Sequence, residues 1–294
     1  MNIIIHRGTH QIGGSAIEIS TASTRIILDF GNELSLDEKY TPINLDIDGV
    51  TKGLPDCDGI VISHYHMDHL GQLTSALPEI PLYMGELSKE VAMIATEHQD
   101  KDLYLRLLDA NTFRGGEAFT IGNIHIRPLV IDHSAVDSYM FVIEAEGKRV
   151  LYTGVINNVY YESSLYRRHD SPLVLSKGPY PKYYMDHGFV SLVRGTEYFI
   201  SHIKEFPKDD VRIIYSMWTG YIEENLALKT LLETYPTYIC HASGHVSKDD
   251  LIKFIELVNP DVIIPVHTDN PERLEELVPH RNVYIVNDNE PFII

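Results

Sequence analysis

Six positions of the sequence, from His64 to His69, hold three histidines and one aspartate in the order HYHMDH. Imidazole nitrogens and carboxylate oxygens are ordinary ligands of zinc and related divalent cations. A lone histidine is more often a core or surface residue, but four ligand-type side chains in six positions have little structural use. His64, His66, Asp68 and His69 therefore predict a metal site.

This histidine box follows the apolar run GIVIS and precedes the segment HLGQLTSALPE. The first segment is typical of a buried strand and the second of a helix. Side chains alternate along a strand end, which places His64 and His66 on one side, where they can share one ion. Asp68 and His69 follow as the chain turns into the helix, and they can bind a second ion nearby.

The remaining chain must supply the elements that position this box. Its 294 residues, 44% of them hydrophobic, suffice for one large core with a modest appended domain. Strand-like runs such as NIIIHRG, AIEIST and TRIILDFG alternate with helix-like runs such as ELSKEVAMIATEHQ, which predicts an α/β layered fold. Near the end, DVIIPVH and NVYIVND predict two strands after the helix SKDDLIKFIELVN, whose expected N-cap is Ser247.

Composition also limits the compartment and the partners. No run of eighteen apolar residues and no signal-peptide pattern occurs, so no membrane partner is expected. Two cysteines, Cys57 and Cys240, without a CxxC spacing favour a reduced, cytoplasmic protein. The formal net charge of −18 argues against broad attraction to nucleic-acid backbones.

Residues 158–212 differ from this acidic background. Their formal charge is +1, which leaves −19 for the rest of the chain, and they contain seven of the 18 tyrosines. Such a segment can stack on the bases of single-stranded nucleic acid. A packed surface between domains, or between the copies of a homo-oligomer, explains the same composition, and both explanations stay open.

Beyond the box, the sequence resembles the metallo-β-lactamase-fold hydrolases. Asp29 in IILDFG is similar to the early strand-end aspartate of that family, and His133 in VIDHSAVDS is similar to its later lone histidine. The resemblance implies an αββα sandwich in which His64, His66 and His133 hold a first zinc ion. For Asp29, two roles stay open: a turn or capping residue, or a brace of the metal loop.

The C-terminal third resembles the end of the β-CASP ribonucleases, the group that includes ribonuclease J. The similar stretches are CHASGHVSKDDLIKFIELVNPDVIIPVHTDNPERLEEL and YSMWTGY. Carried over residue by residue, His245 of the SGH motif would be the general acid. Ser216 and Ser243 would contact the substrate phosphate.

The same resemblance implies a second metal ion, held by Asp68, His69 and His267. Asp68 and His245 would then be the catalytic residues. One or two zinc ions are expected, and manganese accepts the same ligands. The substrate implied is single-stranded RNA or DNA.

Two features depart from the family pattern. Where the family has TGD, whose aspartate bridges the two metals, this sequence has VLYTGVINN, with Val155 at the bridging position. Without that carboxylate, two neighbouring ions repel each other more strongly, and the second should bind more weakly. The β-CASP insertion is also shortened to about residues 156–236, between core segments 1–155 and 237–294.

These observations favour a phosphodiesterase or nuclease that acts on single-stranded nucleic acid through a water activated by zinc. Two alternatives remain. The loss of the bridging aspartate is compatible with a weak or inactive relative that binds metal and phosphate. The short insertion leaves the cleft open enough for a small ester or phosphodiester.

Overall fold

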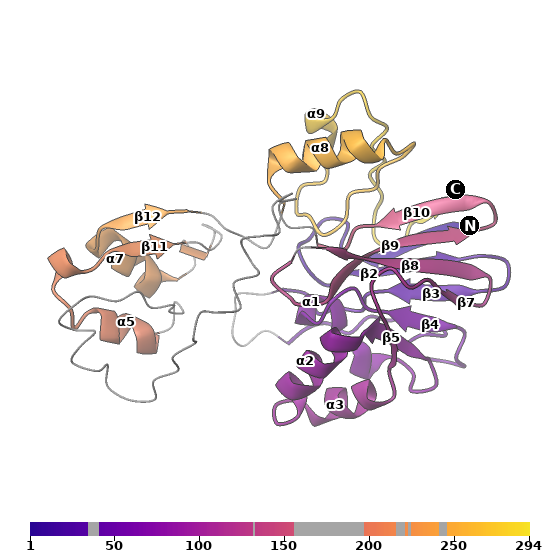
Figure 1. Ribbon diagram of the computed structural model, residues 1–294, viewed down its shortest axis with the longest axis horizontal. Helices are drawn as coiled ribbons and strands as arrows, with labels where there is room; N and C mark the ends of the chain where they lie inside the picture. Colours follow the sequence, from indigo (N-terminus) through magenta and orange to yellow (C-terminus); the bar gives the residue numbers. More distant parts are fainter. Residues whose placement is uncertain (35–40, 132, 156–196, 216–220, 223–224, 241–245) are drawn as a thin grey trace. The chain divides into compact units, whose positions relative to one another are not determined.

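The structure is a computed structural model (Figure 1). It describes residues 1–34, 41–131, 133–155, 197–215, 221–222, 225–240 and 246–294. Its contacts divide the chain into two compact units, one of residues 1–159 with 244–294 and one of residues 160–243.

Two β-sheets form the framework of the first unit. The seven-stranded sheet has the order β13 (Pro291–Ile293), β1 (Asn2–Arg7), β2 (Ala16–Ser20), β3 (Arg25–Leu28), β4 (Gly59–Val61), β5 (Leu82–Gly85) and β6 (Asn111–Phe113). The four-stranded sheet has the order β10 (Lys148–Tyr152), β9 (Ser138–Ala145), β8 (Ile124–Ile131) and β7 (Phe119–Ile121). Strands β3 to β6 are parallel, whereas all other neighbours in the two sheets are antiparallel.

Helices of the first unit fall between and after these strands. They are α1 (Met67–Leu70), a 3-10 turn (Leu73–Ser75), α2 (Glu86–Thr96), α3 (Lys101–Leu108), α8 (Lys248–Val258) and α9 (Glu272–Leu277). The predicted α/β fold is confirmed. The expected N-cap of α8 is also present, because the backbone N of Asp250 donates to Ser247 Oγ at 3.2 Å.

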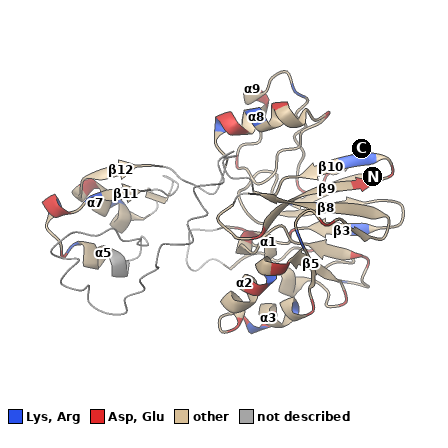
Figure 2. Cartoon of the chain, in the orientation of Figure 1, with Lys and Arg blue, Asp and Glu red and all other residues tan. Residues whose placement is uncertain are grey.

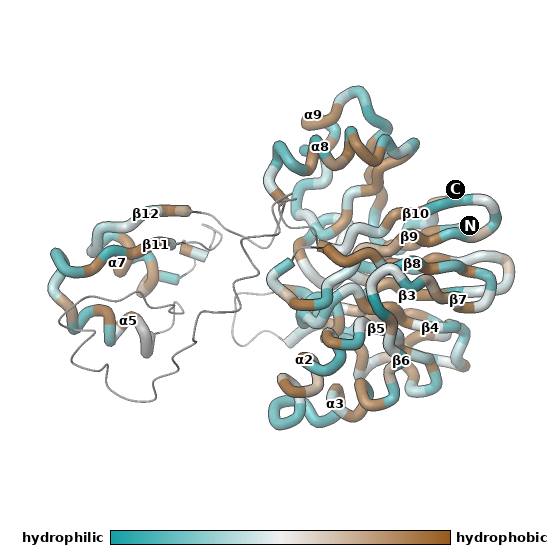
Figure 3. Tube along the Cα trace, viewed as in Figure 1, coloured by the Kyte–Doolittle hydropathy of each residue, from teal (hydrophilic) through white to brown (hydrophobic). Residues whose placement is uncertain are grey.

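The strand β3 explains how the two layers are held together. Ile27 points to an apolar cluster that includes Leu103 and Leu107 of α3, so that helix packs on this face of the sheet. Ile26 and Leu28 point to the opposite cluster, which lies between the two sheets. Both faces of β3 and β4 are thus buried, which is why IIL of β3 and GIV of β4 are apolar runs (Figure 3).

The prediction of two strands near the C-terminus is wrong. DVIIPVH and NVYIVND share only an isolated bridge between Ile263 and Val283. Pro265 in the first run has no N–H to donate to a ladder, and His267 adopts a left-handed backbone with φ of 59°. The strand that does close the sheet is β13, which pairs with β1.

The second unit has a small core of its own. It contains α5 (Glu197–Ile203), a 3-10 turn (Lys208–Asp210), β11 (Ile213–Tyr215), α7 (Leu226–Thr234) and β12 (Thr237–Ile239). The strands β11 and β12 pair in parallel. Helices and strands of this unit bury apolar side chains against one another, among which are Tyr215 of β11 and Leu228 and Leu231 of α7.

Charged side chains are spread over the helices of both units. Figure 2 shows Asp and Glu along α2, α7, α8 and α9. None of the described helices combines the length and the hydrophobicity that a bilayer crossing requires.

Candidate metal centre

The histidine box lies where β4 ends and the chain enters α1. The expected helix after the box is shorter than predicted, because α1 covers only Met67–Leu70 before the chain forms the 3-10 turn. The side chain of Gln72 explains the early end. It donates to Asn32 Oδ1 at 2.8 Å and accepts from Leu45 N at 3.3 Å, so packing against the neighbouring loops replaces helical continuation.

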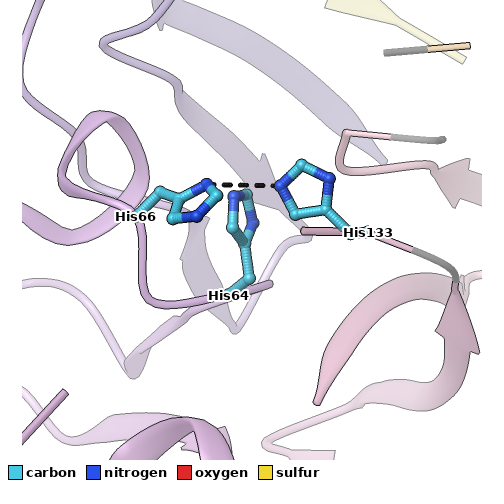
Figure 4. A group of neighbouring side chains, drawn as sticks. All are labelled: His64, His66 and His133. Atoms are coloured by element: carbon cyan, nitrogen blue, oxygen red, sulfur yellow. Dashed lines mark hydrogen bonds between the residues drawn. The ribbon is translucent and has the colours of Figure 1, made fainter. Parts of the chain in front are cut away.

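His64, His66 and His133 form the first ligand group. Their ligand atoms all lie within 4.8 Å of one another (Figure 4). The ring centroid of His64 lies 4.7 Å from that of His66 and 4.5 Å from that of His133. Nδ1 of His66 lies 3.2 Å from Nε2 of His133. Three imidazoles that converge in this way match a zinc site whose fourth position is open.

His64 shows why an ion fits this group. Its Nε2 atom is buried and has no hydrogen-bond partner among the described residues. Burial, and then the neighbouring rings of His69 and His133, lower the pKa of His64 far below its ordinary value. The ring is therefore neutral at physiological pH, and its buried nitrogen lacks the partner that such atoms normally have. A cation would supply that partner and needs the neutral ring.

Asp68, His69 and His267 form the second ligand group, and their ligand atoms also lie within 4.8 Å of one another. Asp68 Oδ2 lies 3.3 Å from His69 Nε2 and 3.8 Å from His267 Nε2. Burial disfavours the charge of His69, but Asp29 and Asp68 outweigh it and raise the pKa of that ring to about 9. The two carboxylates that hold a proton there would equally favour a cation.

Asp29 lies fully buried at the base of the site. Its carboxylate accepts hydrogen bonds from Ser63 N (2.7 Å), Ser63 Oγ (2.8 Å), His69 Nδ1 (2.7 Å) and Tyr152 OH (2.6 Å). Ser63 Oγ in turn lies 3.0 Å from His64 Nδ1, so Asp29 is linked to both ligand groups. With Nδ1 of His69 engaged, its Nε2 is left for a metal. Of the two roles left open for Asp29, these contacts favour the brace.

Sequence reasoning missed Ser63, Tyr152 and Ser15. Ser15 Oγ lies 3.2 Å from Nδ1 of His267, and thus orients the second ligand group as Ser63 orients the first. Ser63 directly precedes the box, which is a signal that could have been used. Nothing local in the sequence indicates that Tyr152 reaches Asp29, 123 positions away.

The bridging position, Val155, follows β10 and is 6% exposed. A Cβ built on the preceding Gly154 would lie 3.5 Å from Ser63 Cβ, so this segment runs beside the floor of the site. Val155 belongs to none of the apolar clusters that the described residues form. The other predicted site residues, Ser216, Ser243 and His245, lie outside the described residues.

Comparison with models of known protein families shows that most of the chain matches one of them. The model described as "Beta-lactamase superfamily domain" matches residues 24–268. That range contains both ligand groups and Asp29.

Several curated relatives are ribonucleases by name. Probable RNase MJ4 of Methanocaldococcus jannaschii is 33% identical over 97 residues, which cover 32% of this chain and 21% of that protein. Ribonuclease J of Helicobacter pylori is 24% identical over 164 residues, which cover 50% of this chain and 22% of that protein. The RNase J-like protein of Methanocaldococcus jannaschii is 27% identical over 161 residues, which cover 52% of this chain and 35% of that protein. The chain thus spans only about a fifth to a third of the length of these relatives.

Two solved structures match over nearly their full length. A protein of unknown function from Enterococcus faecalis V583 superposes with a TM-score of 0.65 at 16% identity, covering 100% of this chain and 99% of that one. The metallo-beta-lactamase fold protein YhfI from Bacillus subtilis superposes with a TM-score of 0.52 at 12% identity, covering 99% of both. At these identities the likeness concerns the fold alone.

Proposed function

Because this chain belongs to the family described as "Beta-lactamase superfamily domain", has the metallo-β-lactamase fold and is distantly similar to RNase J-like ribonucleases, we propose that it is a metal-dependent phosphodiesterase acting on single-stranded RNA or DNA. The observation that supports this most is the adjacency of the two ligand groups. The ring centroid of His64 in the first lies 4.0 Å from that of His69 in the second.

Each ligand group would hold one ion, with zinc as the first choice and manganese as the alternative. His64, His66 and His133 would hold the first, and Asp68 would join His69 and His267 on the second. When bound, such a pair of ions supplies a deprotonated water and neutralises the charge that develops on the phosphate.

The chain's own groups would orient the reactants and move the protons. Asp68, whose Oδ2 lies between the two histidines of the second ligand group, would accept the proton of the attacking water. His245 would donate a proton to the leaving oxygen, and Ser216 and Ser243 would hold the phosphate. These three assignments rest on the SGH and YSMWTGY motifs alone.

Val155 supports a second candidate function. A valine at the bridging position favours a protein that binds one metal and phosphate but hydrolyses slowly or not at all. The small-molecule hydrolase has no comparable observation behind it. Both cysteines are free, which accords with the cytoplasmic setting that we propose.

Metal analysis and a cleavage assay together test the proposed function. We expect about two metal ions per chain and cleavage of 5′-phosphorylated single-stranded RNA or DNA. A chelator should abolish cleavage, and zinc or manganese should restore it. One ion or none, without cleavage of either substrate, would instead support the binding protein. Cleavage that survives complete removal of metal would contradict the proposal.

Replacement of Val155 by aspartate should tighten binding of the second ion by at least about tenfold, because a carboxylate near both ions adds charge and a ligand. Affinities can be measured by competition with a chromogenic chelator. The matched control is Val155→Asn, which has the same shape without the charge and should leave the affinity unchanged.

Thermal unfolding separates this outcome from its alternative. If position 155 faces the ions, the aspartate variant with metal should be as stable as the parent. Unchanged metal affinity with a lower Tm would mean that the carboxylate is a buried, uncompensated charge. The second ion would then lack a bridging position altogether.

A further inference from the structure

The loop that carries His133 joins β8 to β9, and two hydrogen bonds attach this loop and the start of β9 to the segment that follows β4. The backbone N of Val136 donates to Tyr65 OH at 3.2 Å, and the backbone N of Tyr139 donates to Ser63 O at 3.0 Å. Tyr65 and Ser63 flank His64. The same short segment that presents one ligand therefore also holds the loop that presents another.

Asp137 attaches this loop to a second element, the N-terminus of α2. Its Oδ2 atom accepts from the backbone N of Ser88 at 3.0 Å, and its Oδ1 atom accepts from Tyr139 OH. The first turn of a helix has backbone N–H groups that no residue of the helix can satisfy. The N-cap residue of α2 is Gly85, which has no side chain to do so. Asp137 thus supplies a cap from a loop 49 residues further along the chain.

The absence of a side chain at Gly85 leaves room for the carboxylate of Asp137 at the start of α2. A Cβ built on Gly85 would overlap with the carboxylate of Asp137 and would lie 2.6 Å from Tyr139 Cε2, so a larger residue there would displace the cap. Asp137 itself has a left-handed backbone with φ of 61°. Residues other than glycine keep that conformation when surrounding contacts hold it. The contacts of its carboxylate with Ser88 N and Tyr139 OH therefore constrain the loop at the residue that caps the helix.

We propose that Asp137 is a positioning residue of the metal centre, which fixes the loop so that His133 meets His64 and His66. This inference rests on the proposed function, because it presumes that the first ligand group holds an ion. His133 is the only member of that group from outside the histidine box. Its place depends on contacts distant in sequence, and a displacement of about 1 Å is enough to impair a metal site.

A matched pair of variants separates positioning from ordinary helix capping. Asp100 caps α3 as Asp137 caps α2, because its Oδ1 accepts from the backbone N of Leu103 at 3.0 Å. Asp137→Ala and Asp100→Ala each remove one aspartate cap, and both should lower the Tm of the metal-free protein. Only the first releases the loop of His133.

The readouts are the affinity for zinc, by chelator competition, and the visible absorption spectrum of bound cobalt, which reports ligand geometry. We expect Asp137→Ala to weaken the tighter zinc site by about 10- to 100-fold and to change the cobalt spectrum. Asp100→Ala should match the parent in both. If Asp137→Ala does not fold, Tyr65→Phe tests the same loop, because it removes the acceptor of Val136 N and leaves α2 intact.

The outcomes distinguish this inference from the function on which it rests. A parent protein that binds no zinc overturns the proposed function. A parent that binds zinc, with Asp137→Ala equal to Asp100→Ala in affinity and spectrum, overturns the positioning role alone. If Asp137→Ala does not fold, an unchanged affinity and spectrum in Tyr65→Phe has the same meaning.

Discussion

Replacement of His66 by alanine is expected to remove most of the bound metal and all measurable hydrolysis. Loss of a group that merely supports a metal ligand costs about 10- to 100-fold in affinity, so loss of a ligand should cost more than about 100-fold. The fold should survive, because the side chain of His66 makes no capping bond at α1. Metal content after dialysis and the cleavage rate are the measurements.

The control is His98→Ala. The side chain of His98 is 88% exposed and lies in neither ligand group, so that variant should keep its metal and its rate. A His66→Ala protein with full metal content would mean that the first ligand group is not a metal site.

Replacement of Asp29 by alanine should have the largest effect on stability. Four donors now bind its buried carboxylate: Ser63 N, Ser63 Oγ, His69 Nδ1 and Tyr152 OH. Without Asp29 these four donors lose the acceptor that they share. We expect the free energy of unfolding to fall by about 3–5 kcal/mol, which is the usual cost of removing one partner from a buried charged pair. Urea unfolding with a chelator present measures this loss apart from any effect of metal.

Asp58→Ala is the matched control for Asp29. The carboxylate of Asp58 also accepts from a backbone N, that of Arg25 at 2.8 Å, but Asp58 is exposed. Its replacement should change the free energy of unfolding by only about 0.5 kcal/mol. Equal urea midpoints for the two variants would show that Asp29 is not a brace.

The sequence predicted the parts of the site whose signal is local. The histidine box holds four ligand-type residues in six positions, and the unbroken apolar run before it indicated a buried strand. His133 and His267 were grouped with the box through a family resemblance. No periodicity of the chain would have paired either of them with a residue 67 or more positions away.

What the sequence did not predict depends on contacts between distant segments. In the sequence, nothing distinguishes Asp137 from other loop aspartates. Its role as a cap is seen only in the fold, where it lies beside the start of α2 at Gly85. The helix after the box was predicted too long because its pattern is helical, whereas the side-chain contacts of Gln72 with Asn32 and Leu45 decide its end. Propensity is a weak prior where tertiary packing competes with it.

The pairing of β13 with β1 has a consequence for self-association. The strand β1 pairs with β2 on one side, and its other edge would present free N–H and C=O groups to any extended chain. The strand β13 covers that edge through Ile293, Phe292 and Pro291. It is only three residues long, and Pro291 has no N–H to offer a further strand. By pairing with the edge of β1, this short strand limits aggregation. Without β13, that edge of β1 could pair with a strand of another copy of the protein.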